Sequence, residues 1–430
     1  MTTISWGEQF FSQKNYWTQF IQVTERSTHS NGLVVDQAGN SYLLLEVSND
    51  QVGVMESFVI KYQNDGKKIW SRRIEIGAVR TSAQAIAVDQ EGNYYLTGFI
   101  EGQIDEQDLI GNIHAFLSKY RPDGQMEWLK TFGAIDGWTS SAGIVLDQAN
   151  NCYLTGFTNS NLDGENLTGE TDLFLTKYTS TGIRVWTRLL GVSEKNTNAT
   201  ALAIDQQDNL YLTGYTNGSL AEQNISIPLD ALVAMYDSAG NKKWVRLIGA
   251  IGIGEDRFAE GMGIAVDRHG NCLVSGDTNG TLGTEKRIGI VDTFIIKYNL
   301  HGNQLWSKVI GVPHANTYIQ GILVDHEDNL YLCGATDGKL EGQNKTGQID
   351  TFVTKYTQDN KICTKLFGFN ARTILSAKIA ITHDQQLYVT GTTDHQSGQG
   401  SQTNFETAFL TTYFSFINNN SKNQPFKKQN

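Results

Sequence analysis

Four residues that could perform or support chemistry stand at irregular places between otherwise regular segments: Arg80, Trp138, Glu260 and Tyr318. An arginine can hold an anion or polarise a leaving group, and a glutamate or tyrosine can act as an acid or base. A tryptophan supplies an aromatic wall for a ligand. None of the four belongs to the pattern that repeats through the chain, so none has a shared structural duty. We therefore expect any ligand or substrate to contact them.

Other charged or aromatic residues break the pattern in the same kind of connecting segment. They are Arg26, His29, Asp256, Arg257, Phe258, His314 and Arg372. A solvated loop residue is the simpler explanation for each one taken alone, whereas the group as a whole indicates a binding face. The catalytic residues of an enzyme cannot be assigned from this set.

Metal and cofactor motifs are not readable in the sequence. An aspartate recurs in each repeat before Gly-Asn, but a calcium site needs several oxygen ligands that converge, and one such loop supplies too few. Turn capping is the expected role of this aspartate. The eight histidines lack H-E-x-x-H spacing, and no serine elbow or Cys–His arrangement is present. We predict no cofactor and no metal; calcium is the alternative, without a specific motif to support it.

The segments that must position these residues recur along the chain. The first, strand A, ends in an apolar residue and Asp, and after a short turn the second, strand B, reads Tyr-Leu-Thr-Gly or similar. The aspartates are spaced by 53, 58, 58, 62 and 58 residues: Asp36, Asp89, Asp147, Asp205, Asp267 and Asp325. A seventh copy has Thr382 in place of the aspartate.

Two further segments complete each copy. Strand C reads Phe-x-x-Lys-Tyr, as in residues 58–62 and 116–120, and strand D carries a tryptophan, as in Trp70 and Trp128. All four segments are short, rich in β-branched and aromatic residues and bounded by Gly, Asn or Asp, which is typical of β-strands. Four-stranded units repeated radially indicate a β-propeller.

The two ends of the chain indicate how the ring closes. Trp17 lies in a lone strand D before the first strand A, and the seventh copy stops after strand C at Tyr413. Joining these fragments removes exposed sheet edges. We predict an all-β, seven-bladed β-propeller with four antiparallel strands per blade, closed by an N-terminal strand that completes the last blade. It would occupy residues 15–415, between an N-terminal extension (1–14) and a disordered polar tail (416–430).

The repeat resembles a known family. Val-Asp-x-x-Gly-Asn-x-Tyr-Leu-Thr-Gly, followed by Asp-x-Phe-x-x-Lys-Tyr and Trp, is similar to the bacterial SBBP β-propeller repeat and more distantly to NHL repeats. The resemblance covers roughly residues 15–415 and implies a bacterial, often cyanobacterial or surface-associated, propeller. A few similar propellers belong to natural-product pathways as alkylating, bond-forming enzymes, and none of their catalytic motifs maps onto this chain.

Composition narrows the choice of partners. The 430 residues include 34 Lys and Arg against 45 Asp and Glu, for a net charge of −11. Nucleic acids and anionic membranes need a basic footprint, so neither is expected as a partner. No apolar run could cross a bilayer, and the N-terminus does not read as a secretory signal. We expect a cytoplasmic monomer with reduced cysteines.

Alternating strand direction places the B–C and D–A connections on one face of the ring, the loop face. Its loops include residues 101–112, 134–142, 159–171, 192–200, 217–229, 250–262, 279–291, 312–320 and 337–349. The opposite turn face carries the short A–B and C–D turns. Residues seven before each aspartate, such as His29, Glu260 and Tyr318, should border the central channel on the loop face.

Two functions follow from this placement. We expect a binding or scaffold propeller whose loop face binds a protein, glycan or small molecule. The alternative is an enzyme of a bacterial natural-product pathway, of alkylating, bond-forming or lyase type, with its pocket at the channel mouth. Propeller enzymes often draw single residues from several blades, which a sequence pattern does not reveal.

Overall fold

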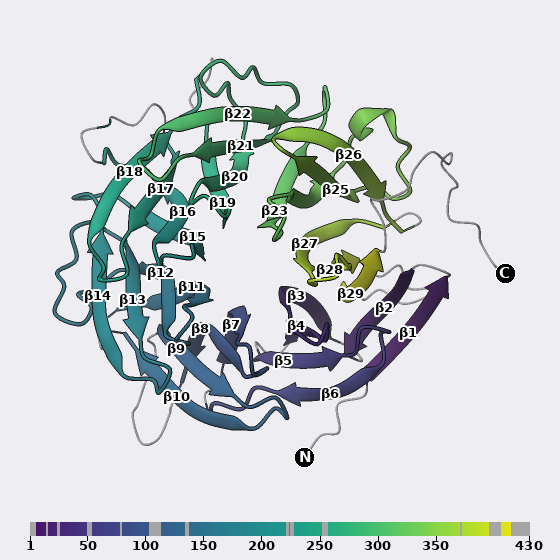
Figure 1. Cartoon of the computed structure of the whole chain (residues 1–430), viewed down its shortest axis with the longest axis horizontal. Coiled ribbons are helices and arrows are strands. Elements are labelled where there is room, and N and C mark those ends of the chain that lie inside the picture. The colour runs from purple at the N-terminus through teal and green to yellow at the C-terminus, as the bar shows by residue number, and fades with distance from the viewer. Residues whose placement is uncertain are drawn as a thin grey trace.

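The computed structural model describes residues 6–13, 16–23, 26–49, 54–77, 80–102, 113–133, 137–220, 223, 228–251, 257–369, 372–394 and 406–413. These residues form seven antiparallel sheets arranged radially around a central axis (Figure 1). A short 3-10 turn, η1 (Leu340–Gly342), lies in the B–C connection of blade 6. The predicted seven-bladed, all-β propeller is confirmed.

Each blade has strand A next to the axis, and strand D is the outermost strand in blades 1 to 6 (Figure 1). The inner strands of blades 1 to 7 are β3 (Ser27–Val35), β7 (Arg80–Val88), β11 (Thr139–Leu146), β15 (Thr197–Ile204), β19 (Ala259–Val266), β23 (Thr317–Val324) and β27 (Ile374–Ile381). The B strands are β4 (Ser41–Asn49), β8 (Tyr94–Glu101), β12 (Cys152–Thr158), β16 (Leu210–Thr216), β20 (Cys272–Thr278), β24 (Leu330–Thr336) and β28 (Leu387–Asp394). The C strands are β5 (Val54–Tyr62), β9 (Ile113–Tyr120), β13 (Asp172–Tyr178), β17 (Asp230–Tyr236), β21 (Asp292–Tyr298), β25 (Asp350–Thr357) and β29 (Glu406–Tyr413). The D strands are β6 (Lys68–Arg73), β10 (Met126–Phe132), β14 (Arg184–Leu190), β18 (Lys242–Ile248), β22 (Gln304–Ile310), β26 (Asn360–Phe367) and, in blade 7, β2 (Tyr16–Val23).

The N-terminal strand closes the ring. Strand β2 pairs antiparallel with β29 and places Phe20 opposite Phe409. Trp17 Nε1 donates to the Asn64 carbonyl of blade 1 at 3.1 Å. Trp70 Nε1 makes the same bond, also at 3.1 Å, to the Pro122 carbonyl of the blade after its own. Trp17 therefore occupies the strand D position of blade 7, and the predicted closure is confirmed.

Blade 7 differs from the other blades by a fifth strand. Strand β1 (Trp6–Gln13) pairs along its whole length with the outer side of β2, from Trp6 opposite Val23 to Gln13 opposite Tyr16. This pairing places residues 6–13 of the predicted N-terminal extension inside the sheet, and it gives this blade five strands where four were predicted. The predicted polar tail, 416–430, lies outside the described residues.

The repeated aspartate organises the turn face. Asp147 Oδ1 accepts from the backbone N–H groups of Ala149 and Asn151 at 3.0 and 2.8 Å. Its Oδ2 accepts from Asn151 Nδ2 at 2.8 Å and from the Tyr153 hydroxyl at 3.2 Å. Lys177 Nζ lies 3.8 Å from the same oxygen. The carboxylate thus accepts hydrogen bonds from the turn and from the tyrosine of strand B, and it lies near the lysine of strand C. These contacts explain why the motif recurs.

Each inner strand bulges near the loop face. In blade 3 the register with β12 skips one residue between Ser141 and Gly143, opposite Gly156. A Cβ on Gly156 would lie 2.0 Å from the Ser140 carbonyl oxygen, so glycine permits this close approach. Met262, the bulged residue of blade 5, is 38% exposed. Solvent therefore reaches the inner strands, and the axis is a channel.

Candidate functional site

Two carboxyl side chains face each other across blade 5 at the loop-face end of the channel. Glu260 on β19 pairs directly with Asp277 on β20. Asp277 is buried, and its Oδ1 accepts from the Ile319 N–H at 2.8 Å and from Thr293 Oγ1 at 3.2 Å. Because Ile319 belongs to β23, Asp277 lies in the seam between blades 5 and 6. No described residue donates a hydrogen bond to Asp277 Oδ2.

The two carboxyls are shifted toward their neutral forms. Burial raises the pKa of Asp277, the hydrogen bonds from Ile319 and Thr293 lower it in part, and the nearby Glu260 raises it further, to about 7. Burial also raises the pKa of Glu260. A buried carboxylate that lacks a cationic partner favours the protonated state. Near neutral pH Asp277 can therefore either donate or accept a proton.

Tyr318 lies beside this pair on blade 6. It is the second residue of β23 and is 39% exposed. Its pKa is raised by burial first and then by the charges of Asp277 and Asp337. The structure thus brings together two of the predicted residues, Glu260 and Tyr318, and it adds Asp277.

The other predicted residues of the inner strands have partners elsewhere on the loop face. His29 Nδ1 lies 2.9 Å from Glu406 Oε2 and joins blade 1 to blade 7. Arg80 Nη1 pairs with Glu101 Oε2 at 2.9 Å within blade 2. Trp138, just before β11, packs edge-on against Phe157 with ring centroids 5.0 Å apart.

These partners show that the predicted set is dispersed. No hydrogen bond, ion pair or ring contact of the described residues joins Arg80 or Trp138 to Glu260 or Tyr318. Arg257 lies just before β19 and is half-buried, whereas His314 is exposed in the loop before β23 with a φ of 60°. Asp256 lies outside the described residues. The structure therefore concentrates the candidate chemistry in blades 5 and 6.

The turn-face end of the channel has a different character. A cavity of about 330 Å³ opens there among the ends of the inner strands of blades 3 to 6. Its polar lining comes mainly from the repeated aspartates and the residues beside them: Asp147, Gln148, Asp205, Gln206, Asp208, Asp267, Arg268, Asp325 and His326. Four of these aspartates are bound to their own turns, as Asp147 is.

Among the described residues, no three or more His, Cys, Asp or Glu side chains are grouped as a metal site requires. The prediction that no cofactor or metal is needed stays a prediction. In the same part of the chain, no helix is long and apolar enough to span a membrane.

Comparison with protein families identifies the repeat. Residues 185–221 and 305–341 match the family model described as a β-propeller repeat, SBBP. Each match runs from strand D of one blade through strands A and B of the next. The chain carries SBBP β-propeller repeats.

A curated relative shares sequence with most of this repeat array. An uncharacterized WD repeat-containing protein of Acanthamoeba polyphaga mimivirus is 24% identical over 411 residues, covering 79% of this chain and 26% of the relative. The chain thus spans about a quarter of that protein's length. The relative is viral, so the bacterial origin implied by the resemblance stays a prediction, as does the likeness to NHL repeats.

Solved structures share the fold at low sequence identity. The polysaccharide lyase Uly1 has a TM-score of 0.50 at 11% identity and covers 90% of each chain. The β-propeller domain of the Trilobed protease from Pyrococcus furiosus has a TM-score of 0.47 at 7% identity, covering 91% of this chain and 97% of that domain. At these identities the similarity concerns the propeller fold alone.

Asp277 was missed by the sequence analysis, although a signal for it exists. It follows the strand B glycine, where most other blades carry an uncharged residue: Phe99, Phe157, Tyr215, Ala335 and Thr392. Blade 1 has Glu46 at this position, and Glu46 is hydrogen-bonded to Ser82 Oγ of blade 2. Ser82 is the counterpart of Tyr318. A comparison of the residue after the strand B glycine across the repeats would have singled out blades 1 and 5.

Proposed function

We propose that this propeller binds a hydroxyl-rich ligand, of the glycan or sugar-like class, at the loop-face end of its channel between blades 5 and 6. The observation that carries the proposal is the pair of Glu260 and Asp277 beside the exposed ring of Tyr318. A binding role is consistent with the propeller fold, and it places the ligand on the face predicted from the sequence.

The chemistry of the three side chains suits hydroxyl groups. A sugar hydroxyl both donates and accepts hydrogen bonds, and a carboxyl that titrates near neutral pH can do the same. Asp277 has a free Oδ2, and Glu260 adds a second carboxyl directly opposite. The face of a tyrosine ring packs against the C–H groups of a sugar while its hydroxyl remains a hydrogen-bonding group.

The proposal can be tested with oligosaccharides. An array of neutral and acidic oligosaccharides would find a ligand, and calorimetric titration would give its Kd for the wild type. The double variant Glu260→Gln, Asp277→Asn keeps side-chain volume but removes both titrating carboxyls, and we expect it to bind at least tenfold more weakly. Asp123→Asn, on an exposed turn of the opposite face, is the matched control and should bind like the wild type. Equal binding by the double variant and the wild type would reject this site.

An enzyme is the second candidate, and one observation favours it. A general acid or base works best when its pKa lies near the working pH, and the pKa of Asp277 is raised to about 7. Tyr318 is the neighbouring group that could exchange a proton with a ligand held between them. A lyase-type reaction, which begins with proton abstraction, fits this pair better than the alkylating chemistry, for which no group in the site gives specific support.

The pH profile separates binding from catalysis. If an oligosaccharide from the array is consumed, its rate should change around pH 7 for the wild type, and Asp277→Asn should abolish turnover while retaining measurable binding. Binding without turnover would support the binding role and reject the enzyme.

A further inference from the structure

Lys378 breaks the repeat inside the channel. It stands on β27 four residues before Thr382, opposite Thr390. The other six blades have glycine or alanine four residues before the aspartate: Gly32, Ala85, Gly143, Ala201, Gly263 and Gly321. Those positions are tightly enclosed, since a Cβ on Gly263 would lie 2.7 Å from Ile322 Cγ2. Only blade 7 places a long charged side chain there.

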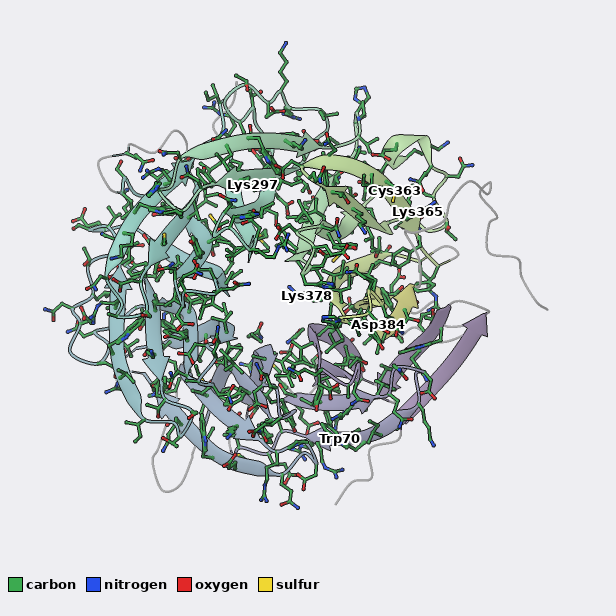
Figure 2. All side chains as sticks on the ribbon, in the orientation of Figure 1. Trp70, Lys297, Cys363, Lys365, Lys378 and Asp384 are labelled. Atoms are coloured by element: carbon green, nitrogen blue, oxygen red, sulfur yellow. The ribbon has the colours of Figure 1, made fainter. Side chains whose placement is uncertain are left out.

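The side chain of Lys378 points toward the axis of the ring (Figure 2). It is half-buried, and its Nζ donates to the Gln320 carbonyl of blade 6 at 3.3 Å. Leu375, on the same inner strand, is 45% exposed, so solvent reaches this part of the channel. The amine therefore stands inside the ring.

The amine lacks a counter-charge among the described residues, because no carboxylate there lies within 4.0 Å of it. Lysines of the repeat differ in this respect: Lys61 and Lys297 each lie 3.2 Å from the aspartate of their own blade. Burial lowers the pKa of Lys378, and the nearby Cys333 thiol raises it slightly. Burial raises the pKa of that thiol to about 12, so at neutral pH the thiol is uncharged and does not balance the amine.

Other titratable groups on the strands around β27 are engaged elsewhere. His29 on β3 pairs with Glu406, and the Tyr331 hydroxyl on β24 bonds to Gln385. The Tyr388 hydroxyl on β28 donates to the Gly39 carbonyl. An uncompensated cation in a protein interior is unfavourable, so an anion from solution would be stabilised beside it.

A second unsatisfied group lies on the residue that contacts the amine. Gln320 Nε2 donates to the Leu375 carbonyl at 2.8 Å, which fixes the amide, while its Oε1 is buried and accepts no hydrogen bond from the described residues. Lys378 thus lacks an anion and Gln320 lacks a donor. One ligand satisfies both if it carries a negative oxygen and a hydroxyl group.

We propose that Lys378 and Gln320 form a binding site inside the channel for an oxyanion that carries a hydroxyl group, of the hydroxycarboxylate class. The negative oxygens accept from Nζ, and the hydroxyl donates to Gln320 Oε1. This site does not depend on the proposed ligand of Glu260 and Asp277, because it joins blades 6 and 7 through a cation, whereas the other site joins blades 5 and 6 through carboxyls.

The experiment observes the amine itself. Lysine labelled at ¹³Cε and ¹⁵Nζ is followed by NMR, and the Lys378 signal is assigned by its loss in Lys378→Ala. Glycolate, acetate and chloride are each titrated at constant ionic strength. We expect saturable shifts of this signal with glycolate, at lower concentrations than with acetate and with little response to chloride. The pKa of Lys378 should rise by about 1 unit at a glycolate concentration tenfold above its Kd, because only the charged amine binds.

The variants guard against an effect of misfolding. Lys378→Ala introduces the residue that Ala85 and Ala201 already provide in blades 2 and 4, so it should fold, and its melting temperature should no longer rise with glycolate. Lys308→Ala removes an outer lysine that lies 5.1 Å from the Trp306 ring centroid, and it should keep the wild-type response to glycolate. A Lys378 signal that ignores all three anions, or that responds equally to all three, would overturn the proposal.

Discussion

Asp267 and Asp277 lie ten residues apart on blade 5, at opposite ends of the channel, and their carboxyls are shifted in opposite directions. Asp267 accepts from the His269 and Asn271 backbone N–H groups and from Lys297 Nζ. Burial alone would raise its pKa, but the bonds from Asn271 and Lys297 outweigh burial and hold the pKa below its ordinary value. Asp277 has two hydrogen bonds and no cation, and its pKa is raised.

The difference distinguishes an aspartate that holds a turn, Asp267, from one that is available for chemistry, Asp277, within a single repeat. An aspartate whose oxygens are all engaged has nothing left for a ligand, and Asp267 has counterparts in five other blades. An aspartate with an open oxygen, at a position where the blades differ, can serve a function of its own. Asp267 and Asp277 therefore have different roles because Asp277 is more deeply buried and lacks the cationic partner that Asp267 has.

The largest expected effect concerns the framework itself. Deleting residues 1–22 removes most of β2, and with it Trp17 and Ile21 from the core between blades 7 and 1. We expect loss of cooperative folding, because the free energy lost with this strand exceeds the total free energy of unfolding of a protein, which is about 5–15 kcal/mol. Circular dichroism and size-exclusion chromatography would show aggregation or unfolding. Deleting residues 1–13 removes only the outer strand β1 and should leave a folded propeller; an equally stable 1–22 deletion would contradict the closure.

The next effect tests the turn-face aspartate. Asp267→Ala removes the acceptor of four donor groups, which belong to His269, Asn271 and Lys297, and leaves Lys297 with Asp359 as its remaining carboxylate partner. Losing one partner of a buried charge pair costs about 3 kcal/mol, and urea unfolding would measure it. Asp277→Ala should cost clearly less, since Asp277 has no cationic partner. If the two substitutions were equally destabilising, the distinction between the two ends would fail.

An effect of comparable size concerns pH. The Asp277 carboxyl binds its proton more tightly in the folded protein than in the unfolded chain, where its pKa is about 3.9. Its contribution to stability is thus present below pH 4 and is lost as pH rises to about 7. We expect wild-type stability, relative to Asp277→Asn, to fall by about 2–4 kcal/mol between pH 4 and 8. Urea unfolding at several pH values would check this, and a constant difference would contradict it.

The smallest effect comes from the channel lysine. Lys378→Ala removes a half-buried cation that has a carbonyl as its partner, so without added oxyanion it should stabilise the protein by about 0.5–1 kcal/mol. Thermal unfolding in chloride buffer is the measurement. A destabilisation above about 1 kcal/mol would mean that Lys378 is a structural residue of blade 7.

The propeller framework could be predicted because the same stabilising sequence features occur in each repeat. The aspartate turn, the strand D tryptophan and the Phe-x-x-Lys-Tyr strand each recur, so an error in one copy is corrected by the others. The closure followed from complementary fragments at the two ends. Strand β1 was missed because it has no counterpart in the repeat. It pairs with the outer edge of β2, and that edge becomes the rim of blade 7 only when β2 has paired with β29.

The site could be predicted only in part. Glu260 and Tyr318 were found because they break the pattern seven residues before the aspartate. His29 and Arg80 break it too, but their carboxylate partners, Glu406 and Glu101, become visible only in the folded ring. Lys378 escaped notice because its copy has lost the aspartate from which positions were counted. A residue's partners across blades, which decide its role, are not encoded in local spacing.

The most direct test of the central distinction is a pH titration of the aspartate side-chain carboxyls by ¹³C NMR, with signals assigned through Asp267→Asn and Asp277→Asn. Our interpretation predicts that Asp267 titrates below its ordinary range and Asp277 at about pH 7 in the same protein. If Asp277 titrated below pH 5 alongside Asp267, the loop-face carboxyl would be one more structural aspartate, and the proposed site would lose its basis.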